Sequence, residues 1–162
     1  MSDAISRICD EREIEALLIE YCCALDRMDL DTISKLFTDD CVVEFGPDKR
    51  LNSRGRSQVA KSLERMWRWV RTSHHLSNVK IRFIEEDHAN SISYVIAWHE
   101  RANETTATIY GQYHDELRRE SNGWRIMKRV MYMNGCDTGF TVNIHPFERQ
   151  SAPEGWVAPS ID

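Results

Sequence analysis

The chain has 162 residues, of which 41% are hydrophobic and 29% charged, and its formal net charge is −5 at pH 7. This length predicts one domain that can bury its own core, and the composition is typical of a soluble globular protein. No apolar run approaches the roughly 20 residues that a membrane-spanning helix needs. The acidic balance argues against a nucleic-acid-binding surface. We therefore expect no membrane and no nucleic-acid partner.

Motifs for targeting and for cofactors are missing from the sequence. The first 13 residues lack the basic-then-apolar order of a secretory signal. The five cysteines show neither a CxxC pair nor the spacing of metal ligands, which favours reduced thiols in a cytoplasmic protein. The few glycines form no phosphate-binding loop. We therefore predict a cytoplasmic protein with no metal and no cofactor.

The N-terminal third is predicted to be helical. Residues 11–28 carry an apolar stripe at helical spacing, and Asp10 is a candidate cap. A second helix is expected over residues 30–37, with Asp29 or Asp31 as its cap. Asp26 lies beside the stripe in the last turn of the first helix, where an acid is slightly unfavourable, and this misfit suggests a specific role. The stripe consists of Ile14, Leu17, Leu18, Tyr21, Leu25 and Met28.

The rest of the chain changes from helical to alternating periodicity. A strand is expected over residues 41–45, a short edge strand within 46–56 and a third helix over 57–70. Short turns then separate four long strand candidates, which predicts an antiparallel meander. The fold class is α+β, with three helices packed in a strongly curved, mainly antiparallel sheet that forms a cone with a pocket. The domain spans residues 1–162, ends in an irregular tail over 137–162, and has its long strands at 75–84, 89–101, 105–119 and 124–136.

Two adjacent histidines stand at the start of the first long strand, in the stretch RTSHHLSNVKIRF of residues 71–83. A histidine here could be a catalytic base or a buried, hydrogen-bonded core residue, because its ordinary pKa of about 6.5 allows proton transfer near neutral pH. Strict alternation puts His75 on the face of the apolar residues Val79, Ile81 and Phe83. His74 would then reach the pocket only if a bulge lies near residues 76–78, and His75 is the alternative base.

Three stretches resemble the NTF2-like superfamily, and within it the SnoaL-like branch of polyketide cyclases, a dehydrochlorinase and dehydratase-like proteins. They are ALDRMDLDTISKLFTDDCVVEF, TSHHLSNVKI and IYGQYHDELRRESNGWRIMKRV, and the resemblance covers most of residues 10–136. It implies the cone-shaped fold. Because members range from isomerases to non-catalytic subunits, it suggests an activity without fixing one.

The resemblance also implies a site. Asp26 and His74 match the family's catalytic pair, in which the carboxylate fixes the imidazole tautomer and stabilises the imidazolium. Arg129 matches a group that would stabilise developing negative charge, and the alternative for it is a rim or interface charge. Tyr21 stands where the dehydrochlorinase-like pattern has a lysine, so halide chemistry is not expected.

Aromatic residues in the middle of the predicted strands are candidates for substrate binding. Trp98, Tyr110 and Tyr113 could line a pocket for a flat or ring-shaped molecule, and the alternative is that they are core residues. Together with Tyr21 and His75 they complete the candidate substrate-binding set.

The sequence leads to one main functional hypothesis and two alternatives. The main one is a cofactor-free lyase or isomerase that acts on a small hydrophobic or aromatic molecule through the His74–Asp26 pair. The alternatives are a non-catalytic scaffold like the β subunit of a ring-hydroxylating dioxygenase, and a small-ligand-binding protein. An exposed face of long strands usually contacts a partner, so we expect a homodimer or a homotrimer.

Overall fold

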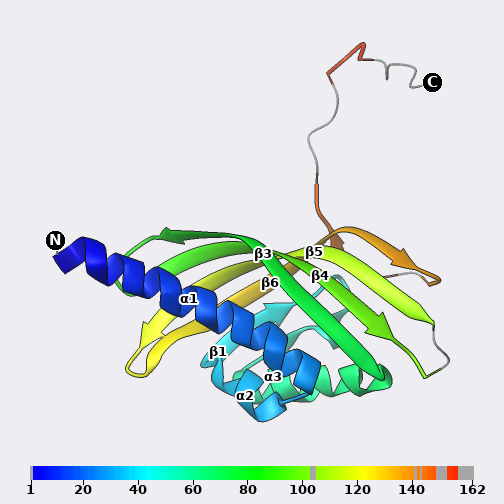
Figure 1. The fold of residues 1–162 in the computed structure, drawn as a ribbon, viewed down its shortest axis with the longest axis horizontal. Helices are drawn as coiled ribbons and strands as arrows, with labels where there is room; N and C mark the ends of the chain where they lie inside the picture. The colour runs from blue at the N-terminus through cyan, green and yellow to red at the C-terminus, as the bar shows by residue number, and fades with distance from the viewer. Residues whose placement is uncertain (1, 103–104, 141, 143, 149–152, 157–162) are drawn as a thin grey trace.

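The computed structural model describes residues 2–102, 105–140, 142, 144–148 and 153–156. A long N-terminal helix crosses the hollow side of a strongly curved sheet, and two short helices lie beneath one end of it (Figure 1). The helices are α1 (Ser2–Arg27), α2 (Leu30–Lys35), α3 (Arg56–Leu63) and the 3₁₀ helices η1 (Lys49–Leu51) and η2 (Glu64–Arg68). The strands are β1 (Phe37–Glu44), β2 (Ser53–Arg54), β3 (Arg71–Phe83), β4 (His88–Glu100), β5 (Thr106–Glu120), β6 (Gly123–Thr138) and β7 (His145–Pro146).

The sheet confirms the predicted meander and adds parallel strands to it. The described strands form a seven-stranded sheet in the order β2-β1-β6-β5-β4-β3, with β7 beside β6. Each neighbouring pair from β3 to β6 is antiparallel, whereas β1 and β7 run parallel to β6. The sheet is therefore mixed and does not close into a barrel, which leaves its hollow side free to receive the helices.

Helix α1 is longer than its apolar pattern predicted. It begins at Ser2 and not near residue 11. The pattern missed the first turns because they bury little: Ile5 and Ile8 are 60% and 58% exposed. Asp10 is not a cap but lies within the helix, where it accepts a hydrogen bond from Trp124 Nε1 at 3.3 Å. From Ile14 onward the predicted stripe is buried against the sheet, up to Leu25.

The connection after α1 follows the sequence prediction in part. Asp29 caps α2, because its side chain accepts the Thr32 N–H at 3.0 Å. Strand β1 begins at Phe37, four residues earlier than expected, because that buried ring pairs with Ile126 before an irregularity shifts the register. The predicted third helix ends as α-helix at Leu63 and continues as 3₁₀ helix η2.

A bulge in β3 reverses which side chains face the hollow. The pairing of β3 with β4 shifts between Ser77 and Lys80, and Asn78 has a φ of 50°. Asparagine tolerates this left-handed conformation better than most residues do. Before the bulge His74 faces inward, whereas after it Val79 and the odd-numbered residues do. The bulge that the sequence required for His74 to face the pocket is therefore present.

The two faces of the sheet differ in character. The inward residues of β4 from Ala89 to Ala97 are small and buried, which leaves room above the strand for the helices and for a cavity. The outer face exposes apolar side chains, and the expectation of a homodimer or homotrimer stays a prediction. These side chains are Ile92, Tyr94, Ile96 and Tyr110. None of the helices in the described part of the chain is long and apolar enough to cross a membrane.

Candidate active site

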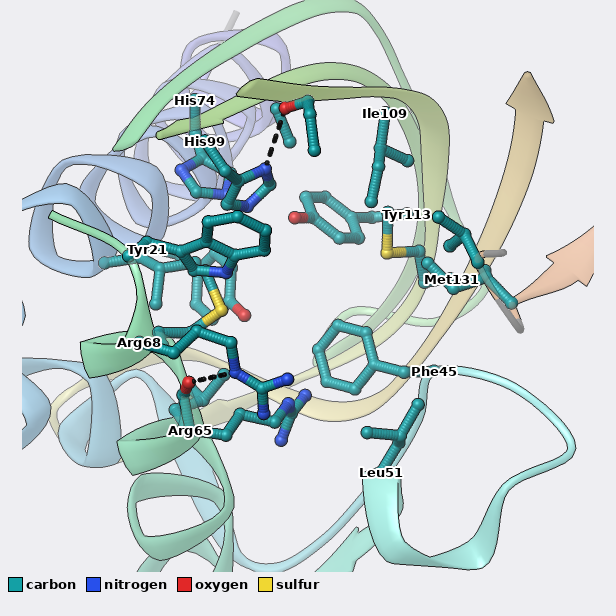
Figure 2. Close-up of a pocket in the computed structure, with 18 of the residues that line it drawn as sticks. Tyr21, Phe45, Leu51, Arg65, Arg68, His74, His99, Ile109, Tyr113 and Met131 are labelled. Atoms are coloured by element: carbon teal, nitrogen blue, oxygen red, sulfur yellow. Dashed lines mark hydrogen bonds between the residues drawn. The ribbon is translucent and has the colours of Figure 1, made fainter. Parts of the chain in front are cut away.

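A cavity of about 190 Å³ opens between the C-terminal half of α1, helix η2 and the inner face of the sheet (Figure 2). Cavities of about 150 Å³ are known to hold a benzene ring, so this one has room for a single ring with a substituent. Most of its lining is apolar or aromatic, with a few polar groups, as in ligand sites generally. The lining includes Tyr21, Leu25, Phe45, Leu51, Leu63, Arg65, Met66, Arg68, Trp69, His74, His99, Ile109, Tyr113 and Met131.

His74 and Asp26 meet at the edge of this cavity. His74 Nδ1 lies 2.6 Å from Asp26 Oδ1, and the His74 side chain is only 3% exposed. Asp26 also accepts the His74 backbone N–H at 2.9 Å and the Thr72 hydroxyl at 2.8 Å. The predicted contact between helix and strand is therefore present, and three donors hold the carboxylate in place.

The protonation of this pair follows from its hydrogen bonds. Burial alone would raise the pKa of Asp26, but the hydrogen bonds from His74 and Thr72 more than offset it, so the pKa of Asp26 lies below its ordinary value. Asp26 is thus a carboxylate at neutral pH and accepts a proton from Nδ1. His74 Nε2 is then left unprotonated in the neutral ring and can act as a base.

A second histidine that the sequence analysis did not select lies beside His74. The His99 ring is perpendicular to that of His74, with 5.4 Å between ring centroids (Figure 2). Its Nδ1 lies 3.4 Å from the Ala107 carbonyl oxygen, so the proton resides on Nδ1. Burial, followed by the charge of His74, lowers the pKa of His99 to about 4. His99 is therefore a neutral ring at physiological pH.

The lowered pKa of His99 predicts a pH dependence of stability. The unfolded chain binds a proton at the ordinary value of 6.5 and the folded chain only near 4, so stability is full above pH 6.5 and falls as the pH drops between these values. The loss is about 1.4 kcal/mol per pH unit within this window, up to about 3 kcal/mol. Urea unfolding of His99→Gln should lack this slope, because glutamine keeps a donor for Ala107 but does not titrate. The exposed control His75→Gln should keep it, and equal slopes in both variants would contradict the prediction.

Arg129 occupies neither of the positions considered for it. It is fully buried, with Nε and Nη2 bonded to Asp115 at 2.7 and 2.8 Å. Its guanidinium lies between two rings, 4.2 Å from the centroids of both Tyr21 and Tyr113. Arg129 does not line the cavity, so it cannot touch a ligand there, and a rim or interface charge is also wrong. It acts on the cavity only through the two tyrosines.

The structure divides the predicted substrate-binding residues into two groups. Tyr21 and Tyr113 line the cavity, and their part in substrate binding stays a prediction. For His75, Trp98 and Tyr110 the prediction is wrong, because alternation places their side chains on the outer face of the sheet. His75 there hydrogen-bonds Ser73 through Nε2 at 2.9 Å.

Several lining residues escaped sequence reasoning. The sequence pattern places Arg65, Arg68 and Trp69 in a helix or at its end, and Phe45 at the end of a strand, so it does not mark them as cavity residues. His99 carried a signal that was not used: it is in phase with the small residues of β4, which alternation places on the buried face.

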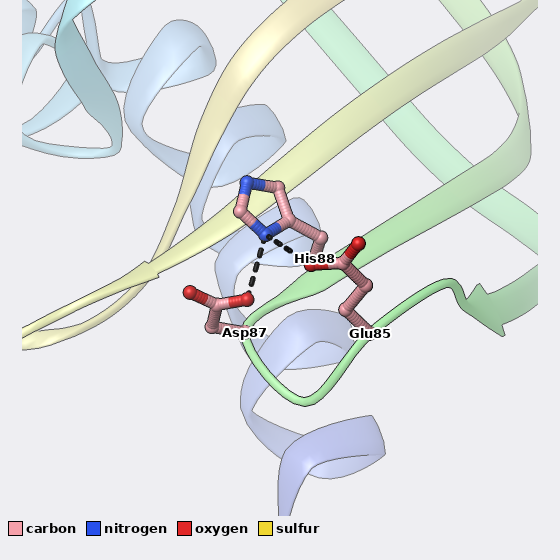
Figure 3. Close-up of side chains that lie close together, drawn as sticks. All are labelled: Glu85, Asp87 and His88. Carbon is pink, nitrogen blue, oxygen red and sulfur yellow. Dashed lines mark hydrogen bonds and ion pairs between the residues drawn. The ribbon is translucent and has the colours of Figure 1, made fainter.

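One group of described residues could hold a metal ion, and it lies away from the cavity. Glu85 and Asp87 lie in the turn between β3 and β4, and His88 is the first residue of β4 (Figure 3). His88 Nδ1 is 2.7 Å from Asp87 and 3.9 Å from Glu85. The two acids are exposed, as are many acidic turns that bind no metal. The prediction of no metal therefore stays a prediction.

The helices, the mixed curved sheet and the cavity define an NTF2-like fold. The family model of the SnoaL-like domain matches residues 6–130, so the chain belongs to the SnoaL-like family of the NTF2-like superfamily. Among curated proteins, an uncharacterized protein of Mycobacterium tuberculosis is 24% identical over 131 residues, which cover 78% of this chain and 87% of that protein.

Solved structures share the fold across most of the chain. A candidate scytalone dehydratase of Novosphingobium aromaticivorans is 29% identical, with a TM-score of 0.85 over 93% of this chain and all (100%) of the other. A candidate aromatic ring hydroxylase of the same organism is 26% identical, with a TM-score of 0.70 over 76% and 88% of the two chains. The hexachlorocyclohexane dehydrochlorinase LinA-type3 of Novosphingobium barchaimii is 17% identical, with a TM-score of 0.76 over 88% and 99%, which shows the fold alone.

Proposed function

We propose that the protein is a cofactor-free enzyme of the dehydratase or isomerase type, in which His74, held by Asp26, removes and returns a proton. The observation that carries this proposal is the partly buried hydrogen bond between the two side chains at a cavity large enough for one ring. Family membership and the similarity to the candidate scytalone dehydratase support this class of enzyme.

The reaction needs a base, a group that keeps the abstracted proton until it is returned, and a hydrogen-bond donor that stabilises developing negative charge. His74 Nε2 takes a proton from a carbon next to a carbonyl, and Asp26 stabilises the imidazolium that forms. In a dehydration the imidazolium returns that proton to the departing hydroxyl group, and water and a double bond result. In an isomerisation it returns the proton to another carbon.

In this proposal the hydroxyl groups of Tyr21 and Tyr113, and not Arg129, stabilise the developing negative charge. The Tyr113 hydroxyl is directed into the cavity (Figure 2). Burial, as the largest effect, raises the pKa of Tyr21 and raises that of Tyr113 well above its ordinary value. Both phenols therefore stay protonated and can donate a hydrogen bond to an enolate oxygen.

Proton transfer can be tested before the natural substrate is identified. Small cyclic ketones and β-hydroxy ketones are incubated with the protein in D₂O, and NMR follows deuterium incorporation while absorbance follows new conjugated double bonds. We expect exchange or elimination above the buffer rate for the wild type and a loss of about a hundredfold or more in His74→Gln, which keeps the side chain's size but removes the base.

The chain supplies a matched control for this experiment. His75→Gln changes the neighbouring histidine, which lies on the outer face of the sheet, and should retain wild-type rates. Equal losses in the two variants, or none in His74→Gln, would contradict the proposal. Binding without exchange in the wild type would favour a ligand-binding protein, and co-purification with a large iron-containing chain would favour a dioxygenase scaffold.

A further inference from the structure

Two arginines line the end of the cavity opposite the histidines. Arg65 and Arg68 belong to helix η2, and Figure 2 shows their guanidinium groups close together near Phe45, with His74 and His99 at the other end. Among the described residues that line the cavity none is an aspartate or a glutamate. The chain as a whole has a net charge of −5, so this positive region is a local feature.

Neither arginine has a carboxylate partner in the described part of the chain. Arg65 Nη1 donates to the Ser62 carbonyl oxygen at 2.5 Å and to the Ser62 hydroxyl, and Arg68 Nε donates to the Arg65 carbonyl oxygen at 2.7 Å. The Arg65 guanidinium lies 5.1 Å from the Phe45 ring centroid. These contacts engage neutral groups only and leave Nε and Nη2 of Arg65 and both Nη atoms of Arg68 for a ligand.

The guanidinium groups of Arg65 and Arg68 repel each other electrostatically. Burial, as the largest effect, and the nearby charge of Arg68 lower the pKa of Arg65, although Tyr21 acts in the opposite direction. A third cation contacts a different part of the lining: Arg101 Cζ is 5.1 Å from the ring of Trp69, whose centroid lies 5.0 Å from that of His99. Arg65 is partly buried, whereas Arg68 is exposed. A partly buried charge without a partner is costly, and an anion between the two guanidinium groups would reduce this cost for Arg65.

We propose that the ligand of this cavity is a small ring-containing carboxylate, whose acid group binds Arg65 and Arg68. Guanidinium groups suit this role because their N–H donors match the two oxygens of a carboxylate. The ring then lies among Phe45, Trp69 and Tyr113, and the end of the molecule remote from the acid reaches His74. This inference names the substrate class for the proposed function, but binding of the acid does not require turnover.

The test compares two ligands of the same shape and different charge. 4-Ethylbenzoate and its neutral amide, 4-ethylbenzamide, are titrated into the full chain by calorimetry at low salt. A charge-assisted pair of hydrogen bonds predicts a dissociation constant about ten- to a hundredfold lower for the acid. In Arg65→Gln/Arg68→Gln this preference should vanish while the weak binding of the amide persists, and added salt should weaken only the acid.

Control variants separate local from general effects. Arg12→Gln/Arg82→Gln removes the same charge from exposed positions away from the cavity and should keep the preference for the acid. Arg65→Lys/Arg68→Lys keeps the charge but loses the paired donors, so it should retain only part of the preference. Equal affinity of the wild type for acid and amide, or an equal loss in the exposed double variant, would overturn the inference.

The outcomes for this inference and for the proposed function are distinguishable. His74→Gln should abolish proton transfer and still prefer the acid. If proton transfer depends on His74 but the protein binds the acid and the amide equally well, the proposed function stands and only the inference of a carboxylate ligand is refuted.

Discussion

Asp26→Asn is expected to lower kcat by about a hundredfold to ten-thousandfold while the chain stays folded. One Asp26 oxygen accepts the His74 backbone N–H and the other accepts from His74 Nδ1 and Thr72. If asparagine keeps its oxygen toward the backbone N–H, its NH₂ group faces Nδ1. The ring must then carry its proton on Nε2, which removes the base. The opposite orientation sets two donors against each other at the backbone.

The measurement is steady-state kinetics on whichever substrate of the ketone panel the wild type converts, together with thermal unfolding. Asp29→Asn is the matched control, because it removes one negative charge three residues away and asparagine also caps helices well. It should retain wild-type kcat. If Asp26→Asn keeps more than about a tenth of the activity, Asp26 does not fix the tautomer of His74.

Asp115→Asn is expected to destabilise the protein by about 3 to 5 kcal/mol, because it leaves a buried cation without its partner. Both Arg129 and Asp115 are shielded from water, with 0% of each side chain exposed. Burial alone would lower the pKa of Arg129, but the charge and hydrogen bonds of Asp115 more than offset it, so this pKa lies above its ordinary value. Arg129 therefore stays protonated, and in Asp115→Asn its buried charge has no partner.

Urea unfolding checks this value against two further variants. Glu116→Gln removes the same charge from the next residue, whose half-exposed carboxylate lies 3.3 Å from Lys128, and should have no measurable effect. Asp115→Leu/Arg129→Met replaces the whole pair with apolar groups and should recover most of the loss, since methionine packs well between aromatic rings. A small effect of Asp115→Asn would show that water reaches Arg129.

The sequence predicted the architecture because its dominant forces are local and periodic. The stripe from Ile14 to Leu25 and the alternation of the long strands each identify a buried face without knowledge of the partner. The residues that the pattern missed bury little: the first turns of α1 are exposed, so no apolar period marks them. The parallel pairing of β1 with β6 joins segments far apart in the chain, and no local pattern records it.

The site was harder to predict because it depends on which face each residue takes. Asp26 and His74 were placed by resemblance, and the orientation of His74 required a bulge that alternation alone could only state as a condition. Trp98 and Tyr110 were assigned to the pocket for their chemistry, although each is out of phase with the buried residues of its strand. The position of Arg65 and Arg68 at the cavity could not be predicted, because a helical pattern does not show which surface the end of a helix faces.

Asn78, the residue of β3 in the left-handed conformation, separates two parts of the strand that have different functions. Its apolar half, Val79 to Phe83, must pack beneath α1, whereas its first half must present an imidazole to the hollow. Since the register shifts at Asn78, even-numbered residues such as His74 face the hollow before it and odd-numbered residues do so after it. A different side chain at position 74 would therefore alter the base at the cavity without changing which residues of Val79–Phe83 pack against the core.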